Sequence, residues 1–224
     1  MKKLGQIETI SLSDQAIKKL KDRILSGQIA PSSHFIAEDI AKELGISRTP
    51  VRDALIKLAS EGLLTYDGKG YVVVSFSAKD IRELYAVRRV LEIFALRTTF
   101  AHLTDDQVSQ FRRLYERTQR RLQEKGEGAD LMVKLDTALH QLIYDGSDNK
   151  RLQRILEDIR EKLWFIHRWG QITRKIEYIE TAKVEDFGEF LASLESRDVE
   201  KALSLMELHL GSGEEFTLEC LGFS

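Results

Sequence analysis

The chain has 224 residues, 42% of them hydrophobic and 31% charged, which suits a globular protein of one large domain or a small domain followed by a larger one. Its 34 basic and 36 acidic side chains leave a net charge of −2, so the whole chain gives no global sign of nucleic-acid binding and a local patch must carry any DNA contact. The single cysteine, Cys220, excludes an intrachain disulfide, and the absence of an export signal or of an apolar stretch near about 18 residues leads us to expect a cytoplasmic protein without a membrane span.

Two helices are predicted before residue 46. Ser13 is predicted to cap the first helix, which runs to about Ser26 and is stopped by a glycine and a proline. A second, two-turn helix follows and ends at Gly45. Its apolar stripe has the spacing of one helical face and consists of Ala37, Ile40, Ala41 and Leu44.

A third helix and a β-hairpin complete the first part of the chain. Ser47 is predicted as the N-cap of this helix, with a proline near its first turn and Gly62 at its end. Two β-forming runs, residues 63–66 and 71–74, then flank a glycine-rich turn and predict a hairpin. The inward stripe of the third helix consists of Val51, Ala54, Leu55 and Leu58.

The rest of the chain has no proline and is predicted to be helical. Ser77 with Asp80, and Thr104 with Gln107, have the spacing of capping boxes, and each pair opens a long amphipathic stretch. Further helices are predicted to begin near Asp130, Asn149, Lys183 and Asp198. Glycines expected to punctuate these helices are Gly126, Gly128, Gly146 and Gly170.

These elements predict a mainly α protein with two domains. Residues 1–76 are expected to form a winged helix-turn-helix of three helices plus a β-hairpin, in which the third helix enters the major groove of DNA. Residues 77–224 are expected to form an all-helical, effector-binding and dimerisation bundle of about six helices. The short joint between the two lies near residues 76–79.

Exposed basic side chains favour DNA binding by the first domain. Up to Phe76 the chain has 11 basic and 9 acidic residues, a charge of +2, whereas the remainder has 23 and 27, a charge of −4. Arg48 and Arg52 are predicted one turn apart on the outward face of the third helix, with Thr49 beside them; arginine can donate two hydrogen bonds to guanine. Ser47 and the first amides of the helix can hold a phosphate. The alternative is an ordinary solvated helix face.

The sequence context decides between these two interpretations. The segment LGISRTPVRDAL, residues 44–55, followed by Leu58 and by Glu-Gly-Leu at residues 61–63, strongly resembles the signature of the GntR family of bacterial regulators. The resemblance covers about residues 12–74, with Ser32 and Ala37 at positions where many members have glycine and glutamate. It implies that the residues facing DNA are Ser47, Arg48, Thr49, Arg52 and the wing residues Gly68 and Lys69.

The second domain begins with a segment, LYAVRRVLE at residues 84–92, that resembles the first helix of the FCD sensing domain of the FadR-like subfamily. Arg88 lies on an apolar helical stripe in this segment, and burial of an unpaired charge is costly. Two interpretations stay open. Arg88 either pairs with a glutamate such as Glu92 within the chain or clamps the carboxylate of an effector.

Polar residues also interrupt the inward stripes of two later helices. Asp136 and His140 lie one turn apart, and His209 lies on a stripe near the end of the chain. One carboxylate and two imidazoles suit zinc, nickel, iron or manganese. Alternatively, each histidine is a hydrogen-bonded core residue, and Asp136 pairs with His140.

The FCD resemblance favours the metal. Metal-binding members of the subfamily have an aspartate and a histidine four residues apart here and another histidine in the last helix, which Asp136, His140 and His209 match. These members have one more histidine where this chain has Phe187. His167 is a candidate substitute ligand or effector contact; a three-ligand site completed by water and effector, or a site that has lost its metal, are the alternatives.

We therefore predict a DNA-binding transcription regulator, a repressor rather than an enzyme, controlled by a small carboxylate. An acyl thioester sensed without metal is one alternative, and a non-haem metalloenzyme domain is another. Because helix-turn-helix proteins read paired half-sites, we expect a homodimer on double-stranded operator DNA. Trp164 and Trp169 are expected in the core or in the dimer contact, and the arginines of residues 112–121 on a solvated helix face.

Overall fold

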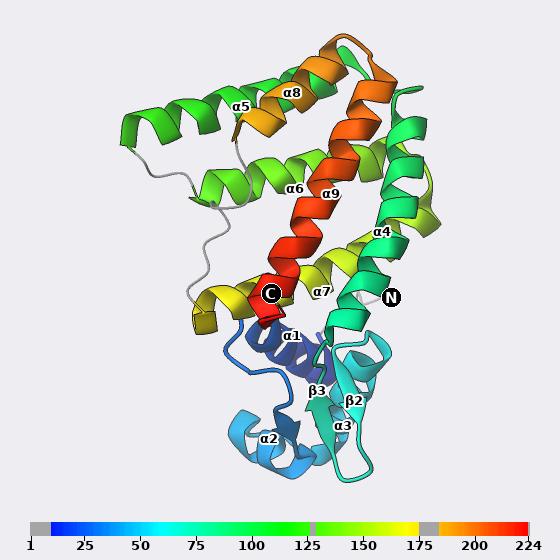
Figure 1. Cartoon of the computed structure of the whole chain (residues 1–224). Helices are drawn as coiled ribbons and strands as arrows, with labels where there is room; N and C mark the ends of the chain where they lie inside the picture. Colours follow the sequence, from blue (N-terminus) through cyan, green and yellow to red (C-terminus); the bar gives the residue numbers. More distant parts are fainter. Residues whose placement is uncertain (1–9, 126–128, 175–183, 224) are drawn as a thin grey trace, which may run out of the picture. The chain divides into compact units, whose positions relative to one another are not determined.

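The computed structural model describes residues 10–125, 129–174 and 184–223, which form two compact units (Figure 1). The first unit ends at Ser75 and the second begins at Phe76, one residue before the predicted boundary. Within the described ranges, no helix is long and apolar enough to cross a membrane.

The first unit contains three helices and a small antiparallel sheet, and it has the predicted winged helix-turn-helix order. The helices are α1 (Leu12–Leu25), α2 (Ala37–Leu44) and α3 (Arg48–Ser60). The strands are β1 (His34–Phe35), β2 (Leu64–Tyr66) and β3 (Tyr71–Val73). The sheet order is β1-β3-β2, and Val72 of the central strand lies opposite both His34 and Thr65. Strand β1 was not predicted, because two residues are too few for an alternating pattern.

The N-cap of α1 differs from the prediction. Ser11, and not Ser13, accepts the backbone N–H of Asp14, at 3.0 Å, and its hydroxyl donates to the carboxylate of Asp14 at 2.6 Å. Ser13 lies inside the first turn of the helix. The reason is that Ser11 has an acidic residue three positions later, whereas Ser13 has the buried Ala16, so only Ser11 has the partner that makes this start favourable.

Left-handed backbone conformations shape the loops before and after α2. Gly45, the C-cap of α2, has a φ of 67°, which glycine adopts without the steric cost of a Cβ. Ser32 has a φ of 63°. This is the position where the GntR resemblance leads us to expect glycine, and the backbone of the chain keeps the conformation that glycine favours.

The second unit contains six helices in the described residues, as predicted. They are α4 (Ala78–Thr99), α5 (Asp105–Lys125), α6 (Ala129–Gly146), α7 (Lys150–Arg174), α8 (Val184–Glu195) and α9 (Val199–Leu221). Lys183, the predicted start of the fifth of them, lies outside the described residues.

Helix caps in this unit follow the predicted pairs. Ser77 and Asp80 form a reciprocal capping box at the start of α4. Thr104 and Gln107 form the same two-way pair before α5, with Gln107 Oε1 accepting the N–H of Thr104 at 2.9 Å. Asp198 caps α9 by accepting the N–H of Lys201 at 3.0 Å.

Helices α4, α6, α7 and α9 surround one end of the hydrophobic core, and α5 and α8 pack against each other at the other end (Figure 1). Helix α4 contacts α9, α6 and α7, so side chains on its inward face meet groups from three other helices. The core between these helices includes Leu96, Leu135, Leu139, Met206 and Leu210. This arrangement places the polar residues of the inward stripes close to one another.

Gly170 was expected to separate helices, and this was wrong. It lies inside α7, where a Cβ would meet Cys220 Cβ of α9 at 2.6 Å and Cys220 Sγ at 2.7 Å. The glycine therefore permits α7 and α9 to approach closely, a tertiary requirement that a single sequence does not reveal. Gly146 is the last residue of α6, whereas Gly126 and Gly128 lie outside the described residues.

Candidate functional sites

Helix α3 buries one face and exposes the other. Its inward stripe is fully buried and consists of Val51, Ala54, Leu55 and Leu58. On the opposite face Arg48, Thr49 and Arg52 are exposed, and Ser47 precedes them without a side-chain capping bond of its own. Ile56, one turn after Arg52, is 54% exposed and was missed in the sequence, although it lies outside the buried stripe. An exposed apolar group here can contact the methyl group of thymine.

An acidic residue of α2 lies beside the first arginine of α3. Glu38 Oε2 lies 3.4 Å from Arg48 Nη1, and Glu38 Oε1 lies 3.3 Å from Lys42 Nζ. All three side chains are largely exposed, so the pairs are weak in stability terms. The sequence did not indicate this contact, because it joins two helices across the turn.

The wing turn is organised by Asp67. Its Oδ1 accepts the backbone N–H groups of Lys69 and Gly70, each at 2.9 Å, and these hydrogen bonds lower the pKa of the Asp67 carboxyl. Gly68 at the tip has a φ of 91°, which favours glycine. Gly68 and Lys69 are both exposed, so the turn presents the predicted wing residues to solvent.

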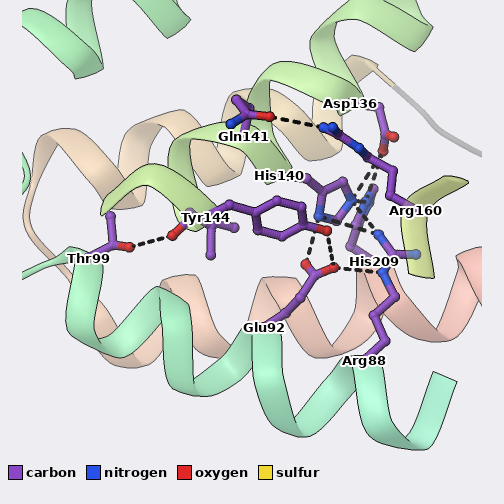
Figure 2. A network of polar contacts seen from close by, with 10 residues as sticks. Arg88, Glu92, Thr99, Asp136, His140, Gln141, Tyr144, Arg160 and His209 are labelled. Carbon is purple, nitrogen blue, oxygen red and sulfur yellow. Dashed lines mark hydrogen bonds and ion pairs between the residues drawn. The ribbon is translucent and has the colours of Figure 1, made fainter. Parts of the chain in front are cut away.

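The structure brings together the three predicted metal ligands of the second unit (Figure 2). Asp136 and His140 come from α6 and His209 comes from α9, and one ligand atom of each lies within 4.8 Å of the others. His209 Nε2 lies 3.0 Å from Asp136 Oδ1 and 3.2 Å from His140 Nε2, and His140 Nε2 lies 3.7 Å from Asp136 Oδ1.

The carboxylate of Asp136 is ionised although one of its oxygens is buried. Its Oδ1 is buried and forms no well-aligned hydrogen bond among the described residues, although His209 Nε2 lies 3.0 Å from it. Burial alone would raise the pKa of Asp136, but His140, His209 and Arg88 outweigh it and hold the pKa well below its ordinary range. A buried, ionised carboxylate oxygen that faces two imidazoles is a group that a divalent cation could bind together with them.

Glu92 of α4 connects this cluster to the helix before it. It is fully buried and accepts hydrogen bonds from Arg88 Nε at 2.6 Å, Tyr144 Oη at 2.9 Å and His140 Nδ1 at 2.7 Å (Figure 2). Because the carboxylate accepts at Nδ1, the lone pair of a neutral His140 lies on Nε2, toward Asp136. The sequence indicated Glu92 only as a partner for Arg88.

Arg88 is buried and contacts two of these residues. Arg88 Nε forms the ion pair with Glu92, and Arg88 Nη2 lies over the His140 ring, 2.9 Å from Nε2 and 3.4 Å from Nδ1. Its guanidinium also lies over the ring of Tyr85, 5.4 Å from the centroid. The intramolecular pair considered for Arg88 is therefore present, and the same guanidinium lies at the edge of the candidate metal centre.

His167 has a different environment from the other two histidines. Its Nε2 lies 2.7 Å from Thr217 Oγ1, which is also 2.9 Å from the hydroxyl of Tyr85 and donates to Gly213 O at 2.7 Å. Burial, and then the charge of Arg88, lower the pKa of His167 to about 4, so it is neutral at pH 7. The structure groups Asp136, His140 and His209 without His167.

Phe187 of α8 stands at the position expected for a fourth ligand. It is buried, and its ring meets that of His209 edge-on with centroids 5.8 Å apart. It supplies an apolar wall where the FCD resemblance leads us to expect an imidazole.

Comparison with known proteins supports both halves of the fold. Residues 83–212 match the FCD domain, and residues 12–74 match the bacterial regulatory proteins of the gntR family. The chain is 27% identical to the HTH-type transcriptional regulator McbR of Escherichia coli (strain K12) over 202 residues, 88% of each chain. It is 28% identical to the gluconate operon transcriptional repressor of Bacillus subtilis (strain 168) over 193 residues, which cover 85% of this chain and 78% of that protein.

Solved structures share the fold. The E. coli McbR/YncC structure matches with a TM-score of 0.69 at 24% identity, covering 94% of this chain and 99% of that one. A putative transcriptional regulator GntR from Rhodococcus sp. RHA1 matches with a TM-score of 0.69 at 20% identity, covering 92% of this chain and 97% of that one.

Proposed function

The chain belongs to the GntR family of bacterial transcription regulators with an FCD domain, and on this premise we propose that it represses an operator until a small carboxylate binds its second unit. The related proteins are regulators rather than enzymes, and the FCD domain implies a small-molecule partner. The observation that carries the DNA-binding proposal is a pair of exposed guanidiniums, one turn apart, on a helix whose opposite face is buried.

Helix α3 is proposed to enter the major groove, with Arg48 and Arg52 donating to guanine and Thr49 beside them. Ser47 and the N-terminal amides of α3 are proposed to hold a phosphate, because the positive end of a helix attracts anions. Gly68 and Lys69 are proposed to contact the neighbouring backbone or groove. Their exposure and the wing turn set by Asp67 support this assignment.

A double variant tests this assignment. DNA taken from upstream of the chain's own gene is the binding probe, and fluorescence anisotropy measures affinity at several salt concentrations. Replacing Arg48 and Arg52 by alanine is expected to weaken binding at least about 30-fold, since each bidentate pair contributes roughly 1 to 3 kcal/mol. The matched control replaces Arg113 and Arg117, which are exposed on α5 at the same spacing, and should leave affinity unchanged. Equal affinity in all three proteins would remove the basis of the DNA assignment.

A divalent metal is proposed in the second unit, held by Asp136, His140 and His209. The donor set and the burial of Asp136 Oδ1 support this fit, and zinc, nickel, iron and manganese are the candidates. A bound metal would act there as a Lewis acid that binds an oxygen of the effector. With Phe187 in place of a fourth imidazole, three protein ligands leave room for water or effector.

The effector is proposed to be a small organic acid. Arg88 supplies a guanidinium at the edge of the metal site, which can bind a carboxylate in bidentate geometry. His167, which shares the Thr217 hydroxyl with Tyr85, is proposed as a second, neutral contact. One relative is named as the repressor of a gluconate operon, and gluconate is a carboxylate, which supports both repression and this ligand class.

Two measurements test the metal and the effector. Elemental analysis of protein purified without chelators should find about one equivalent of a transition metal. Saturation with a carboxylate at about 100 times its dissociation constant should then stabilise the protein by roughly 2.7 kcal/mol and weaken operator binding. Metal-free protein stabilised instead by an acyl thioester would favour the alternative ligand and contradict the metal assignment.

A homodimer is proposed, with α4 in the interface. Val87, Val90 and Phe94 are 51%, 70% and 53% exposed and follow one another along the outer face of this helix. Apolar side chains in a continuous exposed stripe are typical of a surface that is covered by a partner. Trp164, which is exposed on α7, is a second candidate for this contact. Light scattering on the full chain should give twice the monomer mass.

A further inference from the structure

We propose that Ile56 of α3 is a further specificity-determining residue, which contacts the 5-methyl group of a thymine in the major groove of the operator. This inference rests on the proposed DNA binding by α3 and deepens it. It adds an apolar contact to one base to the hydrogen bonds proposed for Arg48 and Arg52.

Ile56 lies near the middle of the exposed face of α3. Each residue of an α-helix turns by about 100°, so residues seven apart differ by only about 20° and residues four apart by about 40°. Ile56 therefore follows Thr49 on the line that points away from the buried stripe of the helix, and Arg52 lies beside this line. If this face of α3 enters the groove, side chains on the line lie closest to the base edges.

The chemistry of the side chain selects its partner. Ile56 is 54% exposed, and isoleucine has neither a donor nor an acceptor, so it can bind no phosphate and no polar edge of a base. Single exposed apolar side chains are common on protein surfaces, but this one lies on the face proposed to contact base pairs. The apolar group that base pairs present in the major groove is the methyl group of thymine. Contact between the two would remove apolar surface of both from water.

The polar groups that follow Ile56 on α3 are bonded within the protein. The hydroxyl of Ser60, one turn later, donates to the backbone oxygen of Lys57 at 2.7 Å. Lys57 Nζ lies 3.6 Å from Glu61 Oε1, and the other oxygen of Glu61 lies 3.1 Å from Lys21 Nζ of α1. A base contact by this end of the helix therefore falls to Ile56.

The spacing along α3 predicts where the thymine lies. Four residues advance an α-helix by about 6 Å, which corresponds to about two base-pair steps of B-form DNA. For a helix that follows the groove, Ile56 is expected to contact a thymine about two base pairs beyond the guanine proposed for Arg52.

Deoxyuridine tests this contact, because it pairs like thymidine and lacks only the methyl group. The probe is DNA from upstream of the chain's own gene, and each thymine in the region that the protein protects from nuclease is replaced singly. Fluorescence anisotropy measures the affinity of the full chain. At the contacted thymine we expect the native protein to bind about fourfold more weakly, which corresponds to the loss of one buried methyl group. Ile56→Ala is expected to bind the thymine probe at least about fourfold more weakly and to be insensitive to deoxyuridine at that position.

The matched control is Leu12→Ala. Leu12 is 52% exposed on α1, so this variant should keep the native affinity and the native sensitivity to deoxyuridine. Native protein that binds every deoxyuridine probe like the thymine probe would overturn the inference and leave the DNA assignment intact. Continued sensitivity of Ile56→Ala at the same thymine would also overturn it. Failure of the native protein to bind the operator at all would refute the proposed function, and this inference with it.

Discussion

Replacement of Glu92 by glutamine probes the buried network from its centre. The carboxylate is fully buried and accepts from Arg88, Tyr144 and His140. Glutamine keeps the volume and one acceptor oxygen but removes the charge that balances the guanidinium. Its amide would also face His140 Nδ1 with a donor, which favours the other imidazole tautomer and places a proton on the nitrogen proposed to bind metal.

The size of the effect follows from the ionisation of Glu92. Burial alone would raise the pKa of Glu92, but the charges of Arg88 and His140 and their hydrogen bonds outweigh it and lower the pKa from 4.5 to about 2. Ionised Glu92 thus contributes about 3 kcal/mol to the free energy of unfolding above pH 4.5, and this contribution is lost as the pH falls through 2. Native protein and Glu92→Gln are expected to differ by about 3 kcal/mol at pH 7 and by about 1 kcal/mol at pH 3.

Urea unfolding followed by tryptophan fluorescence measures this difference. Both tryptophans of the chain, Trp164 and Trp169, lie on α7, so the signal reports the second unit alone. A chelator keeps the protein metal-free. The control is Glu83→Gln, an exposed residue of α4 near Lys79, which is expected to change stability by less than about 1 kcal/mol at either pH. A Glu92→Gln difference that is the same at pH 3 and pH 7 would refute the assignment of the stabilisation to the ionised carboxylate.

Three further variants test other parts of the structure. Gly170→Ala places a methyl group against Cys220 and should lower the free energy of unfolding by roughly 1 to 3 kcal/mol in the same fluorescence assay; an unchanged value would mean that α7 and α9 are not closely packed. Phe187→His adds an imidazole beside His209 and should tighten zinc binding at least about tenfold by calorimetric titration, whereas unaltered affinity would place Phe187 away from the metal site. Phe94→Asp puts a charge in the exposed stripe of α4 and should convert the proposed dimer to a monomer by light scattering, with operator affinity reduced at least about tenfold; a dimer of native affinity would exclude α4 from the interface.

Local signals in the sequence were sufficient for much of the fold. The stripe of α3 and the glycine-rich turn of the wing predict the winged helix-turn-helix, because side-chain periodicity and turn chemistry act within a few residues. The capping pair of Ser77 and Asp80 correctly marks the start of α4 for the same reason. Asp136, His140 and His209 were found as polar interruptions of apolar stripes, although their proposed role as ligands stays a prediction.

Other features depend on contacts between distant residues and gave no readable signal. Gly170 looks like a helix end in the sequence. The structure shows instead that it leaves room for Cys220 of α9, a contact between residues far apart in the chain. The bond between Glu92 and His140 joins α4 to α6, and nothing in either helix alone indicates it. The N-cap at Ser11 was missed for a local reason, since a second serine two residues later offered a competing start.

The pair of Glu38 and Arg48 places a hydrogen-bond acceptor next to the donors of the surface proposed to contact DNA. In the major groove, guanine presents only acceptors at its edge, and the cytosine opposite presents an amino group. A guanidinium can therefore donate to the guanine of one G·C pair while the carboxylate beside it accepts from the cytosine. The negative charge of the carboxylate is also repelled by the DNA phosphates. We therefore expect the protein to select its operators by hydrogen bonds to the bases of this G·C pair, and not by attraction to the phosphate backbone alone.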